Sequence, residues 1–344
     1  MKIRPLNRLS DFVVEQMSRL FMEDNASHNV VAVTVSSLID QVSEDLIDRV
    51  CADPVLCAIA SLDLKMIEQA IAHTSDTVPP KNLLTLVNKV SGAAKFLPML
   101  SYEELVLVNP KEDLRTFTHG RLGEVEKKFY LSHYAIEQQL GAVLTQLHLV
   151  RNGLLGCGDT YSDKSVNMGE VEISLSASVK TLVDLNTTMD PEDFKIFRRF
   201  YMATNHRGLE GPSGAHSGAI PEMEVLLFWD WLWPSRDKYI VSHYGYFPRE
   251  NRERIRVALR QPSLIQMVER EGCRHSDIRS LMLAVAKFMV VFSGKHYGAV
   301  QRHLPEVLAN KASGTSVAEK PGDFLSDIKD ERQQQLNKLI EIFE

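Results

Sequence analysis

The sequence predicts a mostly α-helical protein, and two observations support this fold class. Apolar residues recur at three- and four-residue steps along most of the chain, which is the period of one face of an α-helix. Alternating apolar and polar residues, the pattern of a half-buried strand, are scarce. We therefore expect a large C-terminal helical bundle and a smaller N-terminal helical part, with a boundary near residue 115 that separates 1–115 from 116–344.

The N-terminal part shows the helical period in three segments, residues 6–21, 36–50 and 63–72. Between the first two lies the valine-rich segment 30–35. Valine is enriched in strands because its branched side chain packs well on a pleated surface. This short segment is the one place where the sequence favours β structure.

The C-terminal part is predicted to consist of long helices. Asp190-Pro191-Glu192-Asp193 is a strong helix start, with an aspartate cap, a proline in the first turn and acidic residues near the positive helix end. The predicted helices cover residues 123–150, 169–185, 191–204, 221–233, 276–304 and 323–343.

Three segments between these helices are rich in glycine and small polar residues, which is typical of loops. They are residues 153–166, 205–218 and 309–322, and the third has the composition of a loop that closes over a site. Because functional residues are often carried on loops between rigid elements, we expect a site near one or more of them.

Composition and charge narrow the classes of partner. The chain has 344 residues, 44% of them hydrophobic, and a net charge of −6 without a Lys/Arg run, so we expect no nucleic-acid partner. The N-terminus lacks a signal sequence, and the apolar run 281–292 is too short to span a bilayer. Four scattered cysteines form no C-x-x-C pair. These features predict a soluble, cytoplasmic protein with no membrane partner.

His296 lies between small residues in an apolar helical segment. Ser293 and Gly294 precede it, and Gly298 and Ala299 follow it. A porphyrin lies roughly perpendicular to the iron–nitrogen bond, so the side chains beside an axial histidine must be small or flat. The pattern indicates an axial haem ligand, and the alternative is a hydrogen-bonded histidine of the core.

His303 is a second candidate ligand, seven residues later on the same helix face. Its neighbours Arg302, Leu304 and Pro305 leave less room for a flat macrocycle, which favours His296.

Four segments, taken in order, carry a resemblance to a known family. They are residues 117–131, residues 191–201, the Gly/Ser-rich segment 211–227, and the His296 helix with Ser313-Gly314-Thr315 and residues 324–329 after it. In order and spacing they resemble the indoleamine 2,3-dioxygenase superfamily of histidine-ligated haem oxygenases. This superfamily includes tryptophan 2,3-dioxygenase and the indole ring-rearranging enzyme of pyrrolnitrin biosynthesis. The resemblance covers roughly the last two thirds of the chain.

The resemblance implies a haem b cofactor with His296 as the proximal iron ligand. It places Arg199 where the family's arginine pairs with the substrate carboxylate, and an arginine buried in that apolar helix needs a carboxylate, from a substrate or from within the chain. Further substrate contacts are implied for Phe194, for Ser213 and Gly214 in the distal loop, and for Ser313, Gly314 and Thr315 in the closing loop.

The chain departs from the family pattern in three places. The aromatic pair before the arginine is Phe194-Lys195 here, which alters the wall on which an indole would stack. Ser293 replaces the basic residue three positions before the proximal histidine, so Lys295 or Arg302 is expected to pair with a haem propionate, beside the small Gly294. His216 stands where an uncharged amide is expected. It is the candidate distal acid or base, with His133 as another candidate.

Together these features predict a haem-dependent oxidoreductase that oxidises an indole or other aromatic amino acid with dioxygen or peroxide, and they leave a homo-oligomer open. Two alternatives stay open. A haem-binding sensor or carrier would keep His296 and bind no aromatic substrate. A cofactor-free helical interaction scaffold would bind no haem.

Overall fold

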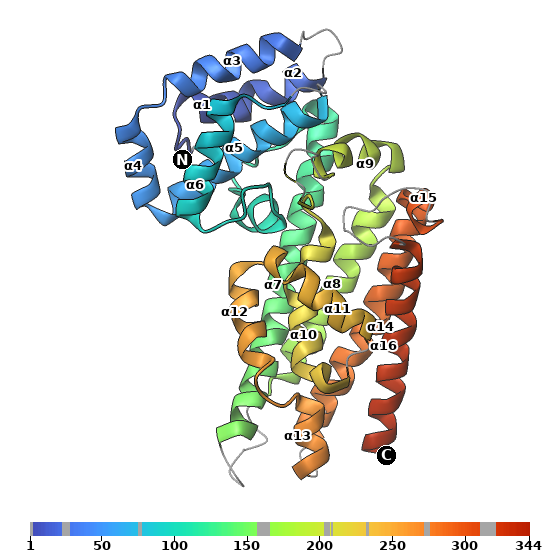
Figure 1. The fold of residues 1–344 in the computed structure, drawn as a ribbon. Helices are drawn as coiled ribbons and strands as arrows, with labels where there is room; N and C mark the ends of the chain where they lie inside the picture. The colour runs from blue at the N-terminus through green and yellow to red at the C-terminus, as the bar shows by residue number, and fades with distance from the viewer. Residues whose placement is uncertain are drawn as a thin grey trace. The chain divides into compact units, whose positions relative to one another are not determined.

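The computed structural model describes residues 3–22, 28–74, 78–156, 166–202, 207, 209–231, 234–271, 276–309 and 321–344. These residues are almost entirely helical, and they include sixteen α-helices and no strand (Figure 1). The predicted fold class, mostly α, is confirmed.

The chain divides into two compact units, and each is built from segments that are distant in the sequence. Among the described residues, unit 1 contains 3–131 and 189–215, and unit 2 contains 132–188 and 216–344. The sequence led us to expect one boundary near residue 115, whereas the first segment of unit 1 continues to Leu131. The long helix α7 (Gly120–Gly156) carries the chain from one unit into the other, which no local composition change marks.

Unit 1 is organised around the helix α5, of which residues 59–71 are all buried. Two ion pairs between fully buried side chains, Asp63 with Arg115 and Lys65 with Glu104, neutralise the charges that this helix carries into the core. The elements of this unit, apart from the start of α7, are α1 (Arg8–Asp11), η1 (Phe12–Met17), α2 (Ser18–Met22), α3 (His28–Asp40), α4 (Glu44–Ala52), α5 (Pro54–Thr74), α6 (Lys81–Ala94), η2 (Glu103–Val108), α9 (Pro191–Arg198) and η4 (Arg199–Tyr201).

Unit 2 is a bundle in which α14 packs along both α8 and α16 (Figure 1). Its short helix α10 is buried on nearly every side and packs against α12 and α13. The elements after α7 are α8 (Met168–Thr188), η5 (Gly214–His216), α10 (Ala219–Phe228), η6 (Trp229–Trp231), α11 (Pro234–His243), η7 (Tyr244–Tyr246), α12 (Arg249–Ala258), α13 (Leu264–Glu271), α14 (Ser276–His303), α15 (Pro305–Leu308) and α16 (Pro321–Phe343).

The predicted helix start at Asp190 is confirmed in detail. The Asp190 side chain accepts a hydrogen bond from the backbone N–H of Glu192 (2.8 Å), and Pro191 occupies the first turn of α9. The α-helix ends earlier than expected, at Arg198, and continues as the tighter turn η4 to Tyr201.

The predicted helix over 221–233 is also shorter, because α10 ends at Phe228 and the turn η6 follows it. The described part of the chain resumes at Pro234, the first residue of α11. A proline lacks an N–H group to donate, so it is tolerated in the first turn of a helix as well as after the end of one.

The expectation of β structure in residues 30–35 is wrong, since these residues lie in the helix α3. Val35 and Ile39, four residues apart, are buried, whereas Val33 is exposed. In a strand Val33 and Val35 would share a face, so the burial follows the helical period. Packing of this apolar stripe outweighs the weak strand preference of valine.

No helix in the part of the chain that the structure describes is long and apolar enough to cross a membrane.

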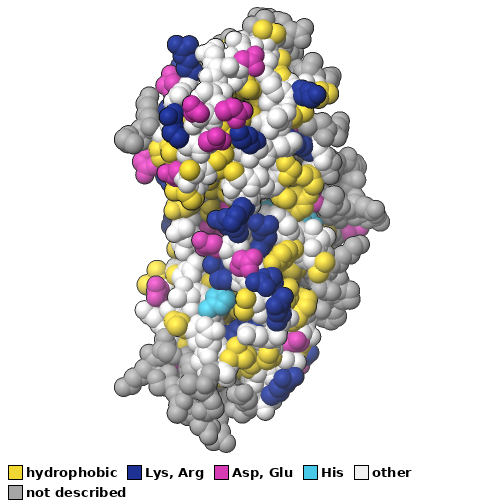
Figure 2. Space-filling view, turned by 60° about the vertical axis from the view of Figure 1, so that its left-hand side comes forward, with side chains coloured by type: hydrophobic (Ala, Val, Ile, Leu, Met, Phe, Trp, Pro, Cys, Tyr) yellow, Lys and Arg dark blue, Asp and Glu magenta, His cyan; other side chains and the backbone are white. Residues whose placement is uncertain are grey.

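On the face drawn in Figure 2, Lys and Arg side chains are mixed with Asp and Glu side chains. The helix α12 shows this mixing, because Arg254 pairs with Glu250 and Arg256 with Glu253. These acidic neighbours weaken the attraction of the arginines for a phosphate backbone.

Candidate functional site

The burial of side chains along the helix α14 changes near its middle. Its first half buries a regular apolar stripe that includes Ile278, Leu281, Met282, Val285 and Met289. From residue 294 to residue 302, about two and a half turns, not one residue is buried. Two packed helices, α8 and α16, nevertheless lie along this element. His296 is in the uncovered stretch.

His296 is deep in unit 2 and yet exposed. Burial among surrounding protein atoms is the main cause that lowers its pKa to about 4, and nearby charges of His133 and Arg332 lower it further. Its own side chain is nevertheless among the exposed ones. At neutral pH the imidazole is uncharged, so a ring nitrogen has a lone pair for a ligand.

The space beside His296 is open at the two nearby glycines. A Cβ atom added at Gly294 or at Gly298 would meet no heavy atom within 4 Å other than those of its own helix and chain neighbours. Glycine in the interior of a helix costs about 0.5–1 kcal/mol relative to alanine. Gly294 and Gly298 both carry this cost, one on each side of His296. As a result, no side chain covers the helix surface at these two positions.

The cation nearest to Ser293 is Arg332 of α16. Its guanidinium donates a hydrogen bond to the Ser293 hydroxyl and two to one carboxylate oxygen of Glu224 on α10 (2.9 and 2.7 Å). Ser293 in turn donates to the backbone carbonyl of Met289 (2.6 Å). Burial lowers the pKa of Arg332 to about 10, so it still carries its charge at neutral pH.

Lys295 and Arg302, the two expected propionate partners, are exposed side chains on α14. We did not predict a role for Arg332, although the sequence carries a signal for it. Ile328, Leu336 and Leu339 are buried with Arg332 on one face of α16. An arginine at helical spacing within an apolar stripe indicates a buried cation that needs an anionic partner.

His303 occupies a different environment seven residues after His296. It is buried, and its Nε2 atom lies 2.9 Å from the side-chain oxygen of Asn186 on α8. This contact identifies it as a hydrogen-bonded histidine of the core. The preference for His296 as the accessible histidine of this helix agrees with that arrangement.

Two of the predicted substrate contacts, Arg199 and Phe194, lie in unit 1. Arg199 is exposed, with its guanidinium 4.7 Å from the ring centre of Phe200, so the expectation that it is buried is wrong. Arg199 is two positions after the buried Phe197, about 200° around a helix axis from it, so it lies on the opposite face. Phe194 packs against Phe129 and Phe197 at ring-centre distances of 5.6 and 5.4 Å. The roles of Arg199 and Phe194 toward a substrate stay predictions.

The Gly/Ser-rich loop that precedes α10 is tightly packed. A Cβ atom at Gly211 would lie 2.0 Å from the backbone oxygen of Tyr201, and one at Gly218 would lie 2.2 Å from the side chain of Asn251. Glycine is required at both positions because other parts of the chain approach so closely. Ser213 is buried and accepts a hydrogen bond from the Ala215 N–H (3.2 Å), whereas Gly214 is exposed. The loop is therefore held in one conformation.

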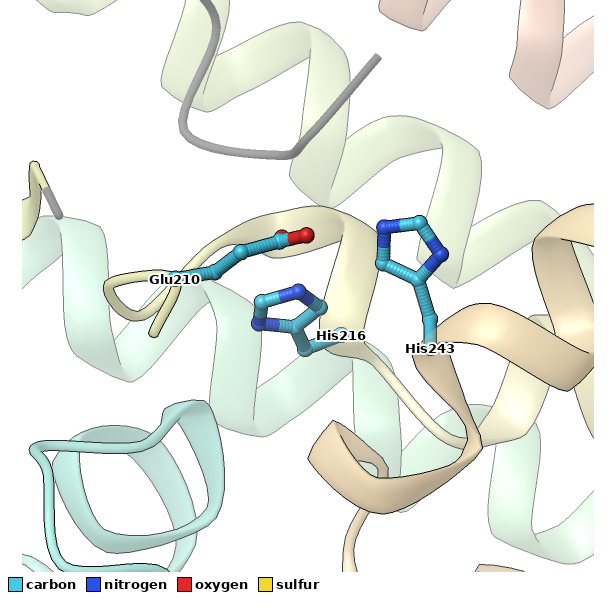
Figure 3. Close-up of side chains that lie close together, drawn as sticks. All are labelled: Glu210, His216 and His243. Carbon is cyan, nitrogen blue, oxygen red and sulfur yellow. The ribbon is translucent and has the colours of Figure 1, made fainter. Parts of the chain in front are cut away.

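This loop brings His216 close to two residues that we did not predict. One carboxylate oxygen of Glu210 and one ring nitrogen each of His216 and His243 lie within 4.8 Å of one another, and all three side chains are buried. Figure 3 shows Glu210 and His216 on the loop, with His243 facing them from the end of α11. No spacing motif joins these residues, because His243 is 27 positions after His216.

The predicted contacts Ser313, Gly314 and Thr315 lie outside the described residues. His133, the other distal candidate, is half-buried on α7, and its charge contributes to the lowered pKa of His296. Thus the described part of unit 2 holds two groups of possible ligands, the imidazole of His296 and the histidine pair His216 and His243.

Comparison with known proteins adds no family to this description. The chain matches no protein-family model and no curated protein.

Proposed function

We propose that this protein binds haem b through His296 and oxidises an indole or another aromatic amino acid. One observation carries the cofactor assignment: His296 is a deep but uncovered imidazole, and the helix surface beside it is open at Gly294 and Gly298. A flat macrocycle needs this combination of an accessible nitrogen and bare flanks. The choice of an aromatic substrate rests on the resemblance to the indoleamine 2,3-dioxygenase superfamily.

The residues of unit 2 fit a haem with anionic propionates. His296 supplies a neutral nitrogen for the iron, and Arg332 supplies a buried positive charge held between Ser293 and Glu224. Haem iron with a single axial histidine and an open opposite face supports activation of dioxygen or peroxide.

Arg199 is the residue that we assign to bind the carboxylate of the amino-acid substrate. An arginine offers two parallel N–H donors to a carboxylate, which gives orientation as well as affinity. Arg199 is exposed, so its guanidinium can be reached by a substrate. His216 as a distal acid or base, and Lys295 and Arg302 as propionate partners, stay predictions of the sequence.

The test is reconstitution with haemin followed by titration with L-tryptophan, L-tyrosine and indole. We expect a histidine-type Soret band that shifts on addition of the aromatic amino acid, and consumption of that amino acid when dioxygen and a reductant, or peroxide, are supplied. Arg199→Ala is expected to weaken binding of L-tryptophan at least tenfold and to leave binding of indole, which has no carboxylate, unchanged. Arg198→Ala is the matched control for the loss of a neighbouring charge.

The outcomes separate the proposal from its two alternatives. Stoichiometric haem binding without any response to aromatic compounds would support a haem sensor or carrier in its place. Failure of the wild-type chain to take up haemin would remove the enzyme assignment and leave a helical scaffold.

A further inference from the structure

We propose that His216, His243 and Glu210 form a site for a divalent transition-metal cation that is distinct from His296. Two imidazoles and one carboxylate are a donor set that binds Fe²⁺, Zn²⁺ and related ions in proteins and leaves coordination positions open. The three side chains are buried together and point toward one another (Figure 3). This inference does not depend on the proposed haem function.

The orientation of His243 is already that of a metal ligand. Its Nδ1 atom lies 3.0 Å from the backbone carbonyl oxygen of Tyr239 and 2.9 Å from the hydroxyl of Ser242. A carbonyl oxygen only accepts hydrogen bonds, so Nδ1 carries a proton, and in the neutral ring Nε2 then has the lone pair. Metal-binding histidines commonly donate their second ring N–H to a backbone carbonyl in this way, which fixes the tautomer.

Aromatic contacts hold both rings in place. The ring of His243 stacks on Tyr239 with 4.2 Å between ring centres, and the ring of His216 stacks on Tyr246 at 4.8 Å with an angle of 15° between the planes. The two imidazole centres are 5.7 Å apart. All four residues belong to unit 2, so the histidine pair is defined within one compact unit.

Glu210 supplies the third donor from the loop that leads into His216. Side-chain nitrogens and oxygens bound to one zinc ion at about 2.1 Å lie about 3.4 Å apart in a tetrahedral arrangement. The candidate donor atoms lie within 4.8 Å of one another, so adjustments of about 1 Å in side-chain position bring them onto one ion. The close packing at Gly211 and Gly218 limits the movement of the loop itself.

The charges favour a divalent cation over the bare cluster. A divalent cation beside the buried Glu210 carboxylate supplies a positive charge that favours its ionised form. A bound M²⁺ accepts lone pairs from all three donors at once. Nitrogen donors favour Fe²⁺, Co²⁺ or Zn²⁺ over Mg²⁺ and Ca²⁺, which prefer oxygen ligands. In this arrangement His216 binds an ion and is not available as a proton relay.

The experiment uses the full-length protein, stripped of metal with a chelator and kept free of haem, and titrates it with Co²⁺ as the probe. We expect one equivalent of Co²⁺ to bind, with visible ligand-field bands that report nitrogen coordination. His216→Ala and His243→Ala should each weaken Co²⁺ binding at least tenfold. Glu210→Gln, which keeps the shape of the side chain and removes its charge, should weaken it by a smaller factor.

Two histidine variants elsewhere in unit 2 serve as matched controls. His148→Ala removes a half-buried histidine that pairs with Glu222, and His303→Gln changes the buried core histidine of α14. Both are expected to bind Co²⁺ as the wild type does. Because His216→Ala could lower stability, His243→Gln and the far-ultraviolet circular dichroism of every variant accompany the titration. Loss of Co²⁺ binding in a variant with wild-type helicity supports the site.

The proposal is overturned if the wild-type chain binds no stoichiometric Co²⁺, or if binding survives both histidine substitutions. The cluster is then a hydrogen-bonded group of the core. Failure here is distinguishable from failure of the proposed function, because haem uptake is measured separately and depends on His296. A chain that binds Co²⁺ and no haem would keep the metal site and lose the haem assignment.

Discussion

The buried carboxyl group of Glu126 in unit 1 and the imidazole of His296 in unit 2 are both deep in the protein, but only Glu126 is covered. The Glu126 oxygens accept hydrogen bonds from the N–H groups of Phe117 (3.0 Å) and Thr118 (2.8 Å) and from the Tyr130 hydroxyl. Tyr201 donates to Tyr130 (2.8 Å) and extends the network. Around His296, no residue between 294 and 302 is buried.

The difference in coverage between Glu126 and His296 distinguishes a polar group that stabilises the fold from one that is accessible to a ligand. Burial is the largest cause of the pKa shift of both residues, since it raises the pKa of Glu126 and lowers the pKa of His296. What separates them is whether the protein itself covers the polar atoms. The Glu126 network satisfies the polar atoms of unit 1 that it joins, whereas His296 is uncharged at neutral pH and its side chain is exposed.

The largest expected effect is on haem binding. His296→Ala should lower the affinity for haemin at least a hundredfold, because the axial bond is lost. His303→Gln, which changes the covered histidine of the same helix, should leave the affinity within about threefold of wild type. Haemin titrations followed by absorbance at the Soret band measure both. If both variants lost the same haemin affinity, the exposure of His296 and the burial of His303 would not explain which histidine binds haem.

Removing the Glu126 carboxyl group should affect folding and not haem. Glu126→Ala leaves two buried N–H groups and two hydroxyl groups without their acceptor, which costs about 3 kcal/mol of unfolding free energy. Urea denaturation monitored by circular dichroism measures the loss. Haemin stoichiometry of the folded variant should stay at one, and a reduced stoichiometry would contradict the separation of the two regions.

A larger side chain beside His296 should weaken haem binding without lowering the stability of the apoprotein. Gly298→Leu meets no neighbour within 4 Å of its new Cβ and replaces a poor helix former, so the apoprotein should gain up to about 1 kcal/mol of stability. The larger side chain should lower haemin affinity at least tenfold. Gly298→Ala is the control that supplies helix propensity with little added volume. Unchanged affinity in Gly298→Leu would place the haem elsewhere.

The smallest effect is a pH dependence of the apoprotein. His296 should titrate near pH 4 in the folded chain instead of near its ordinary pKa of 6.5. Between these values the unfolded chain binds a proton that the folded chain does not, so stability falls as the pH is lowered from 6.5 toward 4. Histidine NMR, with the His296 signal assigned from a His296→Gln variant, measures the pKa. That variant should lose less stability between pH 7 and pH 5 than wild type. A measured pKa near 6.5 for His296 would contradict the burial of this residue among protein atoms.

Local patterns predicted the helices well, because capping and apolar period act over a few residues. The Asp190 cap and the long helices α7, α8, α14 and α16 follow from such patterns. The valine-rich segment misled us because strand preference is weak compared with the packing of Val35 and Ile39.

The candidate sites were only partly predictable. The small residues around His296 are visible in one stretch of sequence, so this residue could be identified. The pairing of Arg332 with Ser293 and Glu224 joins three helices that are distant in the chain, and the same holds for His243 and His216. Long-range packing decides these contacts, and no spacing rule within one segment contains them.

The most direct test of the account is an experimental structure of the haemin-reconstituted chain. The account predicts that His296 would hold the iron through a ring nitrogen, with the haem beside Gly294 and Gly298 and a propionate near Arg332. Iron bonded to another residue, such as His216 or His243, or a protein that contains no haem after reconstitution, would contradict it.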